Sequence, residues 1–461
     1  MDGNDIKRLS DFIPESLIKA LSLVPLSWRV GRSYSKTRKL LEKSQWFSRK
    51  NLEAYQFKTL KDLLIYSYKK VPYYKDLFDR VSFDPASFRS YSEFERIPLL
   101  SKKDVFKNFE RLKSSDFNSF NSYVGHTGGT TGQPLKVLFS IQSHFTEWGF
   151  IHAAWQRAGF SADCRRIAFL GVPFKKNKTA TWKYNHLHRE MQISPRHMED
   201  VNLIEYVKLI KEFKPKFFYG LPSALTTFAA FLLRKNIRIK GIQSVLCGSE
   251  NISVKQRDII SQAFDAKVYS WYGQTEKAVL GGECESSSDY HLFSEYGYTE
   301  LVDNDGNVIN NPGKSGEIVG TGYTNLAMPL IRYRTDDFGE YANGNCGCGR
   351  KYSRIKNLIG RRDNDYIYDK DKVRILFSSI ETQKSVFENV YQWQFVQEKP
   401  GKISVSIVAN PVIKSQDIKE IQNELNFQGH GRIRFDVAVV SNLIKTEAGK
   451  TPALIQYIKE N

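Results

Sequence analysis

The chain has 461 residues, of which 41% are hydrophobic and 13% aromatic, and its formal net charge at pH 7 is +18. The apolar fraction excludes an intrinsically disordered chain, and the length exceeds what one hydrophobic core usually supports, so we expect two or more domains. The positive charge favours an anionic partner, but it does not choose among nucleic acid, a membrane surface and anionic small molecules.

Residues 1–50 are expected to form a basic helical segment. Against the single acid Glu42, residues 29–50 carry Arg29, Arg32, Lys36, Arg38, Lys39, Lys43, Arg49 and Lys50. The apolar stretch 17–30 is too short to span a bilayer, and the first residues lack the apolar region of a secretory signal, so we expect a cytoplasmic protein. Two alternatives stay open for this segment: a helical hairpin packed on the main body, or peripheral contact with anionic lipid.

Residues 51–362 are expected to form a large α/β domain. Apolar residues recur at helical spacing over 53–80 and break at Val71-Pro72, which predicts two helices. Short apolar runs ending in Gly or Pro then alternate with helix-like stretches; the runs are 166–174, 216–222, 242–250 and 266–274, and the stretches are 201–213 and 223–235. This alternation predicts α/β layers with a largely parallel sheet, and ligands in the loops beyond the carboxyl ends of its strands.

Residues 363–461 are expected to form a small α+β domain. Apolar and polar side chains alternate over 402–409 and 432–440, as in strands, whereas 415–425 place an apolar stripe on one helical face. The boundary between the two domains is expected near GRRDND, residues 360–365.

A loop of unusual composition, HTGGTTGQP, occupies residues 126–134. Glycine lets a backbone approach another group closely, and threonine hydroxyls and successive backbone N–H groups donate well to phosphate oxygens. The loop therefore indicates a phosphate-binding site, although its composition alone is equally typical of a surface turn. No Lys-Ser or Lys-Thr follows the glycines, which excludes a Walker A loop.

Four further motifs follow in chain order: WYGQTE (271–276), the stretch 316–339 that contains RTDD, GRRDND (360–365) and KTEAGK (445–450). Together with the loop they resemble the adenylate-forming superfamily of acyl-CoA synthetases, most closely the phenylacetate–CoA ligase branch and its CapK-like capsule-biosynthesis members. The resemblance extends from about residue 50 to the end of the chain. It implies a large adenylation domain of layered sheets and helices and a small, mobile C-terminal domain.

The resemblance also implies roles for individual residues in binding ATP. The β- and γ-phosphates would be wrapped by Thr127, Gly128, Gly129, Thr130, Thr131 and Gly132. Gly248, Ser249 and Glu250 would line the adenine pocket. Tyr272, which precedes Gly273, would stack on the adenine ring. Thr275 would contact the α-phosphate, Glu276 would hold Mg²⁺, and Asp337 would accept hydrogen bonds from the ribose. Arg361 would approach the ribose or phosphate.

Two residues implied by the resemblance belong to the small domain or its boundary. Lys450 would reach in to stabilise charge on the α-phosphate and the carboxylate oxygen, and Asp363 would be the hinge about which Lys450 is withdrawn after adenylation. The chain departs from the family at Gln133, where Lys is usual, and at Asp336, where Gly is common. The choice between Asp336 and Asp337 as the ribose ligand therefore stays open.

Three of the five cysteines gather with a histidine in two Gly- and Ser-rich stretches: Cys284 and His291 in the first, Cys346 and Cys348 in the second. Three thiolates and one imidazole suit tetrahedral zinc, and some members of the branch hold a structural metal on a similar set. With four protein ligands such a site would brace a loop and would not catalyse. Cys164 and Cys247 are expected in the core.

The resemblance implies an ATP-dependent, AMP-forming carboxylate ligase that uses ATP and Mg²⁺ and passes the acyl group to CoA or to an amine. The capsule-biosynthesis members leave open a role in surface polysaccharide biosynthesis, and the alternative is an amide-forming ligase that joins an amino acid or amine to a saccharide acid without CoA. The acid is expected to bind near the helix at 144–155, residues 169–174 and residues 219–223. A catalytically inactive homologue that serves as a scaffold is the alternative of another class. A nucleic-acid-binding zinc protein is disfavoured, because the cysteine spacing fits no finger and the charge is spread along the chain.

Overall fold

The computed structural model describes residues 31–126, 135–169, 181–195, 197–360, 366–377, 380, 382, 385–409, 412–446, 449 and 451–458. These residues divide into two compact units. The first is drawn from Met1–Asp163, His186–His188 and Tyr269–Leu358, and the second from Cys164–Asn185, Arg189–Val268 and Ile359–Asn461.

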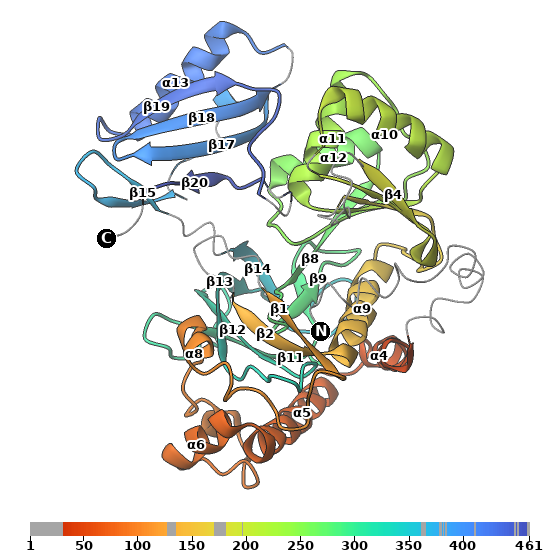
Figure 1. Ribbon diagram of the computed structural model, residues 1–461, viewed down its shortest axis with the longest axis vertical. Coiled ribbons are helices and arrows are strands. Elements are labelled where there is room, and N and C mark those ends of the chain that lie inside the picture. The colour runs from red at the N-terminus through yellow and green to blue at the C-terminus, as the bar shows by residue number, and fades with distance from the viewer. Residues whose placement is uncertain are drawn as a thin grey trace. The chain divides into compact units, whose positions relative to one another are not determined.

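The first unit combines several helices with an antiparallel sheet, and α5–α6 and α4–α9 form separate helix groups (Figure 1). Its helices are α4 (Gly31–Ser44), α5 (Arg49–Lys70), α6 (Pro72–Arg80), α7 (Tyr91–Phe94), α8 (Lys102–Lys107) and α9 (Ile141–Gln156), with the 3₁₀ turn η2 (His186–His188). The strands β1 (Ser122–His126) and β2 (Lys136–Ser140) form a hairpin that is not hydrogen-bonded into the sheet. The sheet contains β9 (Leu280–Gly282), β10 (Tyr290–Leu292), β11 (Gly297–Val302), β12 (Ser315–Gly322), β13 (Tyr333–Tyr341) and β14 (Arg354–Ile359).

The strand β8 (Lys267–Gly273) begins in the second unit and ends in the first. Within the first unit the strand order is β11-β12-β13-β14-β10-β9-β8. Helices α5 and α6 bury Leu60, Leu64 and Phe78 against strand residues that include Leu301 and Ile318. A second cluster joins α4 and α9 to the β9–β10 region through Leu41, Phe150, Leu280 and Phe293.

The described residues of the second unit contain a mainly parallel sheet, a four-stranded sheet and a separate two-stranded sheet. The first follows the order β7-β6-β3-β5-β4. It comprises β3 (Arg166–Phe169), β4 (Trp182–Asn185), β5 (Glu190–Ile193), β6 (Phe217–Gly220) and β7 (Ser244–Cys247), and its helices are α10 (Asp200–Phe213), α11 (Pro222–Arg234) and α12 (Val254–Phe264). The pairs β3–β5, β3–β6 and β6–β7 are parallel, and β4 is antiparallel to β5.

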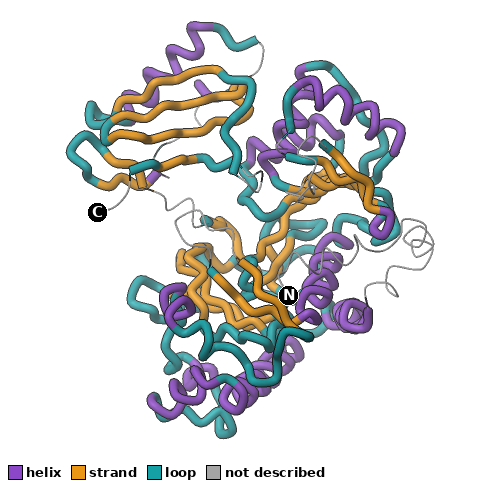
Figure 2. Tube along the Cα trace, viewed as in Figure 1, coloured by secondary structure: helices purple, strands orange, loops and turns teal. Residues whose placement is uncertain are grey.

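The C-terminal part of this unit has the order β19-β18-β17-β20. Its elements are β15 (Tyr366–Tyr368), β16 (Arg374–Leu376), η5 (Ser385–Phe387), β17 (Val390–Lys399), β18 (Lys402–Ala409), α13 (Ser415–Gln428), β19 (Arg434–Val439) and β20 (Leu454–Gln456). Helix α13 covers one face of the four strands (Figure 2) and buries Ile421 and Leu425. Gln392 of β17 donates to the Ser223 carbonyl of α11 (2.7 Å), which ties the two parts together.

Several sequence predictions are confirmed. The helix over 53–80 does break at Val71, the cap shared by α5 and α6, because Pro72 cannot continue the first helix but suits the first turn of the next. The parallel strands over 166–247 and the strand–helix–strand pattern of 402–440 are also present. The prediction of a largely parallel sheet is wrong for residues 280–359, because the strands β9–β12 pair antiparallel with their neighbours. The prediction of a buried Cys164 is wrong, since this side chain is partly exposed, whereas Cys247 is buried. No helix among the described residues is long and apolar enough to cross a membrane.

Candidate functional site

The turn that follows β8 is held by a chain of side-chain hydrogen bonds. The Val279 amide donates to Gln274 Oε1 (3.1 Å), Gln274 Nε2 donates to the Tyr272 hydroxyl, and this hydroxyl donates to Asp337 Oδ2 (2.9 Å). Burial, and then the charge of Asp337, raise the pKa of Tyr272 well above its ordinary value, so the phenol remains a donor. Two motifs that are 65 residues apart in sequence therefore meet at one place.

The carboxylate of Glu276 lies in the same region of the first unit. Its side chain is 3% exposed, and Oε1 accepts a hydrogen bond from the hydroxyl of Tyr333 (3.1 Å). Because Tyr333 and Asp337 are both buried residues of β13, this strand holds both carboxylates through its buried face. Thr275 and Gly273 are exposed. A hard cation such as Mg²⁺ prefers oxygen ligands of this kind, so Glu276 fits the predicted role.

The two neighbouring aspartates of RTDD have different environments. Asp337 is 9% exposed, whereas Asp336 is exposed and has φ +59°. The register of β12 against β13 shifts here, between Glu317 and Val319, so the strand bulges at this point. A left-handed backbone is the reason that glycine suits position 336, and aspartate is among the residues that tolerate it. Burial beside Tyr272 favours Asp337 as the ribose ligand.

The predicted adenine-pocket residues belong to the second unit. Gly248, Ser249 and Glu250 follow the carboxyl end of β7, where ligand loops of a parallel sheet are expected. Ser249 has φ +67°, and Glu250 Oε2 accepts a hydrogen bond from the backbone amide of Ser223 (3.0 Å) in the first turn of α11. Their assembly with Tyr272 into one nucleotide site stays a prediction.

Several predicted residues lie outside the described part of the chain. They are Thr127, Gly128, Gly129, Thr130, Thr131, Gly132, Gln133, Arg361, Asp363 and Lys450. The ends of the phosphate loop are described: His126 of β1 pairs with Lys136 of β2, so residues 127–135 connect the strands of a hairpin. The domain boundary near 363 also stays a prediction.

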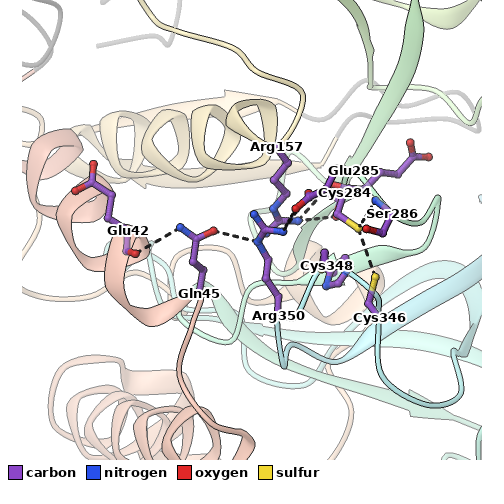
Figure 3. A network of polar contacts seen from close by, with 12 residues as sticks. Glu42, Gln45, Arg157, Cys284, Glu285, Ser286, Cys346, Cys348 and Arg350 are labelled. Carbon is purple, nitrogen blue, oxygen red and sulfur yellow. Dashed lines mark hydrogen bonds and ion pairs between the residues drawn. The ribbon is translucent and has the colours of Figure 1, made fainter.

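The four predicted metal ligands come together in the first unit, and Figure 3 labels the three cysteines among them. One ligand atom from each of Cys284, His291, Cys346 and Cys348 lies within 4.8 Å of the others. Cys284 Sγ is 3.5 Å from Cys346 Sγ, and Cys348 Sγ is 3.8 Å from His291 Nε2. A disulfide would need about 2.05 Å. Tetrahedral zinc with bonds of about 2.3 Å to sulfur would separate two sulfurs by about 3.8 Å, so the arrangement fits such an ion.

The surroundings of the four ligands favour a neutral imidazole. Burial, and then the charges of Arg157, Arg354 and Arg350, lower the pKa of His291 to about 3. A metal ligand must be the unprotonated imidazole, which is therefore already the dominant form at neutral pH. Burial raises the pKa of Cys284 to about 12; an ion bound between the sulfurs would reverse this shift.

Two arginines hold the loops that carry the ligands. Arg157 is buried; its Nη1 donates to the Gly282 carbonyl (2.8 Å), and the guanidinium lies 4.8 Å from the centre of the Phe293 ring. Arg350 pairs with Glu285 (2.9 Å) and donates from Nε to Gln45 (3.0 Å), which links the cysteine loop to the end of α4 (Figure 3). The thiolates of a bound centre would thus face two fixed positive charges.

The sequence analysis missed a buried ion pair beside the nucleotide residues. Lys277 immediately follows Glu276, and its Nζ lies 2.8 Å from Oε2 of Glu147 on α9. A lysine directly after WYGQTE was a visible signal, but its partner is 130 positions away in sequence and could not be identified from spacing.

The sequence of the chain is similar to those of known nucleotide-binding enzymes. Residues 96–328 match the family model described as "AMP-binding enzyme". The chain is 26% identical over 375 residues to protein CapK of Staphylococcus aureus, covering 80% of this chain and 81% of CapK. It is 26% identical over 413 residues to the phenylacetate–coenzyme A ligase of Escherichia coli K12, covering 84% and 89% of the two chains.

A solved 2-hydroxyisobutyryl-CoA ligase, in complex with an acyl adenylate, has a similar fold. The TM-score is 0.68 at 19% identity, over 87% of this chain and 88% of that chain. At this identity the likeness concerns the fold alone.

Proposed function

The chain belongs to the AMP-binding enzyme family, as the sequence resemblance predicted, and we propose that it activates a carboxylic acid with ATP and passes the acyl group to CoA. It is an AMP-forming ligase of the branch that includes the phenylacetate–CoA ligases and CapK. The observation that supports the proposal is that two buried carboxylates of the family's motifs lie along β13: Asp337 accepts a hydrogen bond from Tyr272, and Glu276 accepts one from Tyr333.

In the first step a carboxylate oxygen of the acid forms a bond to the α-phosphorus of ATP. The bond from that phosphorus to the bridging oxygen breaks, and pyrophosphate leaves. Because anions approach each other, positioning and charge neutralisation dominate such a step. Bound Mg²⁺ would supply neutralising charge at the phosphates. Glu276 would hold it, Asp337 would accept from the ribose hydroxyls, and Tyr272 would fix Asp337 and offer its ring to adenine.

The remaining roles follow from the resemblance alone. Residues 127–132 would donate to the β- and γ-phosphates, and Gly248, Ser249 and Glu250 would border the adenine. Arg361 would approach the ribose or phosphate. Lys450 would neutralise the α-phosphate and the attacking oxygen, and rotation about Asp363 would then withdraw it.

In the second step the acceptor attacks the acyl carbon, AMP leaves, and the acceptor's proton passes to solvent. The curated ligases to which the chain is similar are named for coenzyme A, which supports the CoA thiol. A saccharide-linked amine is the alternative acceptor, raised by the resemblance to capsule-biosynthesis members.

The test is carboxylate-dependent pyrophosphate release from ATP and Mg²⁺, over aryl, aliphatic, amino and uronic acids, each with and without CoA. Release with one acid class, and thioester formation with CoA, are the expected results. Adenylation without CoA turnover would favour an amine acceptor. Lys450→Ala should abolish release while leaving the melting temperature unchanged. No release with any acid would leave the scaffold alternative in place of the ligase.

We also propose a structural Zn²⁺ at Cys284, His291, Cys346 and Cys348. The donor set and the mutual distances of the four ligand atoms support it. All four positions of the tetrahedron would be filled by protein, so the ion would fix the two loops and would take no part in the reaction. Metal analysis of the purified protein tests this, with about one zinc per chain expected.

A peripheral contact with anionic lipid is proposed for the basic segment 1–50. Arg32, Lys36, Lys39 and Lys43 lie on the exposed face of α4, opposite the buried Tyr34 and Leu41, which supports it. Cosedimentation with phosphatidylserine vesicles, but not with phosphatidylcholine vesicles, is expected at low salt. Equal sedimentation of a variant with three of these lysines changed to glutamine would contradict it.

A further inference from the structure

The ion pair of Lys277 and Glu147 is largely buried, although the pairs Arg166–Glu190 and Arg332–Glu300 are buried more deeply. The Lys277 side chain is 5% exposed and that of Glu147 is 20% exposed, and the two charges are 2.8 Å apart. Burying an ion pair costs desolvation energy that its attraction often fails to recover, and apolar replacements are often as stable. Stability of the fold is therefore a weak reason for this pair, and a ligand that uses its charges is a stronger one.

The pair keeps hydrogen-bonding capacity that the protein does not use. Among the described residues, Lys277 Nζ has no acceptor besides Glu147, and its other close neighbour is the ring of Phe139, 5.3 Å from Nζ to the ring centre. An ammonium group has three donors. Glu147 Oε1 accepts one hydrogen bond, from the Tyr296 hydroxyl (3.3 Å), and each carboxylate oxygen can accept two. A ligand group that both accepts and donates a hydrogen bond would satisfy the unused donor of Lys277 and the unused acceptor of Glu147.

The position of the pair is next to the proposed chemistry. Lys277 is covalently adjacent to Glu276, and its φ of +58° marks a sharp turn of the backbone, after which the two side chains have different partners. Glu276 contacts Tyr333, whereas Lys277 contacts α9. The attacking carboxylate must lie within bonding distance of the α-phosphate, so the rest of the acid must occupy space beside these residues.

Helix α9 presents a face suited to that role. His144, Glu147 and Trp148 recur at helical spacing in the first half of α9 and are all partly exposed, whereas Phe150 and Ala154, which lie further along the helix, are buried in the core. Burial by the protein is thus incomplete around Glu147. Aromatic side chains on this face would pack against carbon atoms of a ligand, and the ion pair would bind its polar group.

We propose that Lys277 and Glu147 form the specificity site for the acid, and that this acid carries a hydroxyl group in addition to the carboxyl group that reacts. A hydroxyl oxygen accepts from Lys277 Nζ, and its hydrogen is donated to Glu147. A plain hydrocarbon acid would leave both charges desolvated without a partner, which costs binding. The inference rests on the proposed ligase function and names its substrate class.

The experiment compares matched acids that differ by hydroxylation: mandelate with phenylacetate, and 3-hydroxybutyrate with butyrate. For each, kcat/KM is measured from pyrophosphate release. The wild type should prefer the hydroxylated member at least about tenfold, since a site built to bind a hydroxyl group rejects the analogue that lacks it. In the double variant Lys277→Met/Glu147→Leu, which leaves no single charge buried, this preference should disappear or reverse.

The control is Lys356→Met/Glu340→Leu, the same chemical change at a more exposed pair (3.6 Å) on β14 and β13. It should keep the wild-type preference. A purely structural role of Lys277 and Glu147 would lower the melting temperature of their double variant but leave the acid preference unchanged, and that result overturns the proposal. A wild-type preference for the hydrocarbon acids overturns it as well.

A binding measurement separates this proposal from the ligase function. The shift in melting temperature caused by each acid is measured without ATP. If no acid releases pyrophosphate but the hydroxylated acids stabilise the wild type and not the double variant, the ligase function fails and the specificity site stands. If pyrophosphate is released with equal efficiency from both members of each pair, the ligase function stands and the specificity site fails.

Discussion

Replacement of Cys284 by serine tests the metal centre most directly. The site would join Cys284 to Cys346, which are 62 positions apart in sequence. Treated as a cross-link, closure of a loop of that length removes about 14 cal/mol/K of chain entropy from the unfolded state, or about 4 kcal/mol at 25 °C. Because a domain of 150–250 residues shifts by about 2–4 °C per kcal/mol, loss of the ion should lower the melting temperature of the first unit by about 8–16 °C.

The assay combines metal analysis with thermal melts in the presence of a reducing agent. Cys164→Ser is the matched control, because it makes the same change at a partly exposed cysteine of the second unit. The wild type and the control should contain about one zinc per chain, and a strong chelator should bring both down to the melting temperature of Cys284→Ser. Equal zinc content in all three proteins, or equal melting temperatures for the two serine variants, would refute the ligand assignment.

Three other predictions concern single side chains. Glu276→Gln keeps an acceptor for Tyr333 but removes the charge, so pyrophosphate release should fall at least about 100-fold without loss of melting temperature; a fall of less than tenfold would exclude a metal-binding role. Tyr272→Phe removes the donor to buried Asp337 at a cost of about 1–3 kcal/mol, so the KM for ATP should rise about 5- to 150-fold in steady-state assays. Burial lowers the pKa of His291 to about 3, below its unfolded value of about 6.5, so the unfolded state binds more protons and the metal-free protein should lose stability as pH falls from 6.5 towards 3. Between pH 7 and pH 5.5, urea melts of the metal-free proteins should show a smaller loss of unfolding free energy for His291→Gln than for the wild type. Equal losses of unfolding free energy would contradict the lowered pKa of His291.

Local patterns were sufficient to predict the elements of 53–80, 201–274 and 402–440, but not the antiparallel strands of 280–359. The break at Val71-Pro72 and the alternation over 402–409 depend on neighbouring residues, which is why α5, α6 and β18 lie where the sequence places them. The clustering of the four candidate metal ligands was also predicted, because their residue types are rare in this chain and gather in short stretches.

Contacts between distant segments were harder to predict. The sequence could not choose between Asp336 and Asp337, because the choice depends on the bulge in β13 that leaves one exposed and buries the other beside Tyr272. Nor could it pair Lys277 with Glu147, since the helix and the turn are 130 residues apart in sequence and meet only in the folded chain. In both cases the missing information is which face of an element is covered.

The short strand β9 lies between the strands that carry His291, a candidate metal ligand, and Tyr272, a candidate nucleotide residue. Gly282 is paired with Trp271 of β8 and with His291 of β10, and Gly281 is paired with Tyr272. A shift of His291 on loss of the ion would therefore pass to Tyr272 through two backbone ladders that share Gly281 and Gly282. The Gly282 carbonyl also accepts from Arg157, which fixes this junction from the side of α9.

Loss of the metal should accordingly weaken ATP binding as well as stability. Measured well below its melting temperature, Cys284→Ser should show a several-fold higher KM for ATP than Cys164→Ser, while KM for the acceptor changes less. A centre that merely braces a surface loop would lower the melting temperature and leave both constants alone. An unchanged KM for ATP in the folded, zinc-free variant would therefore show that the β8–β9–β10 ladder keeps its register without the ion, and that the two sites are neighbours without being coupled.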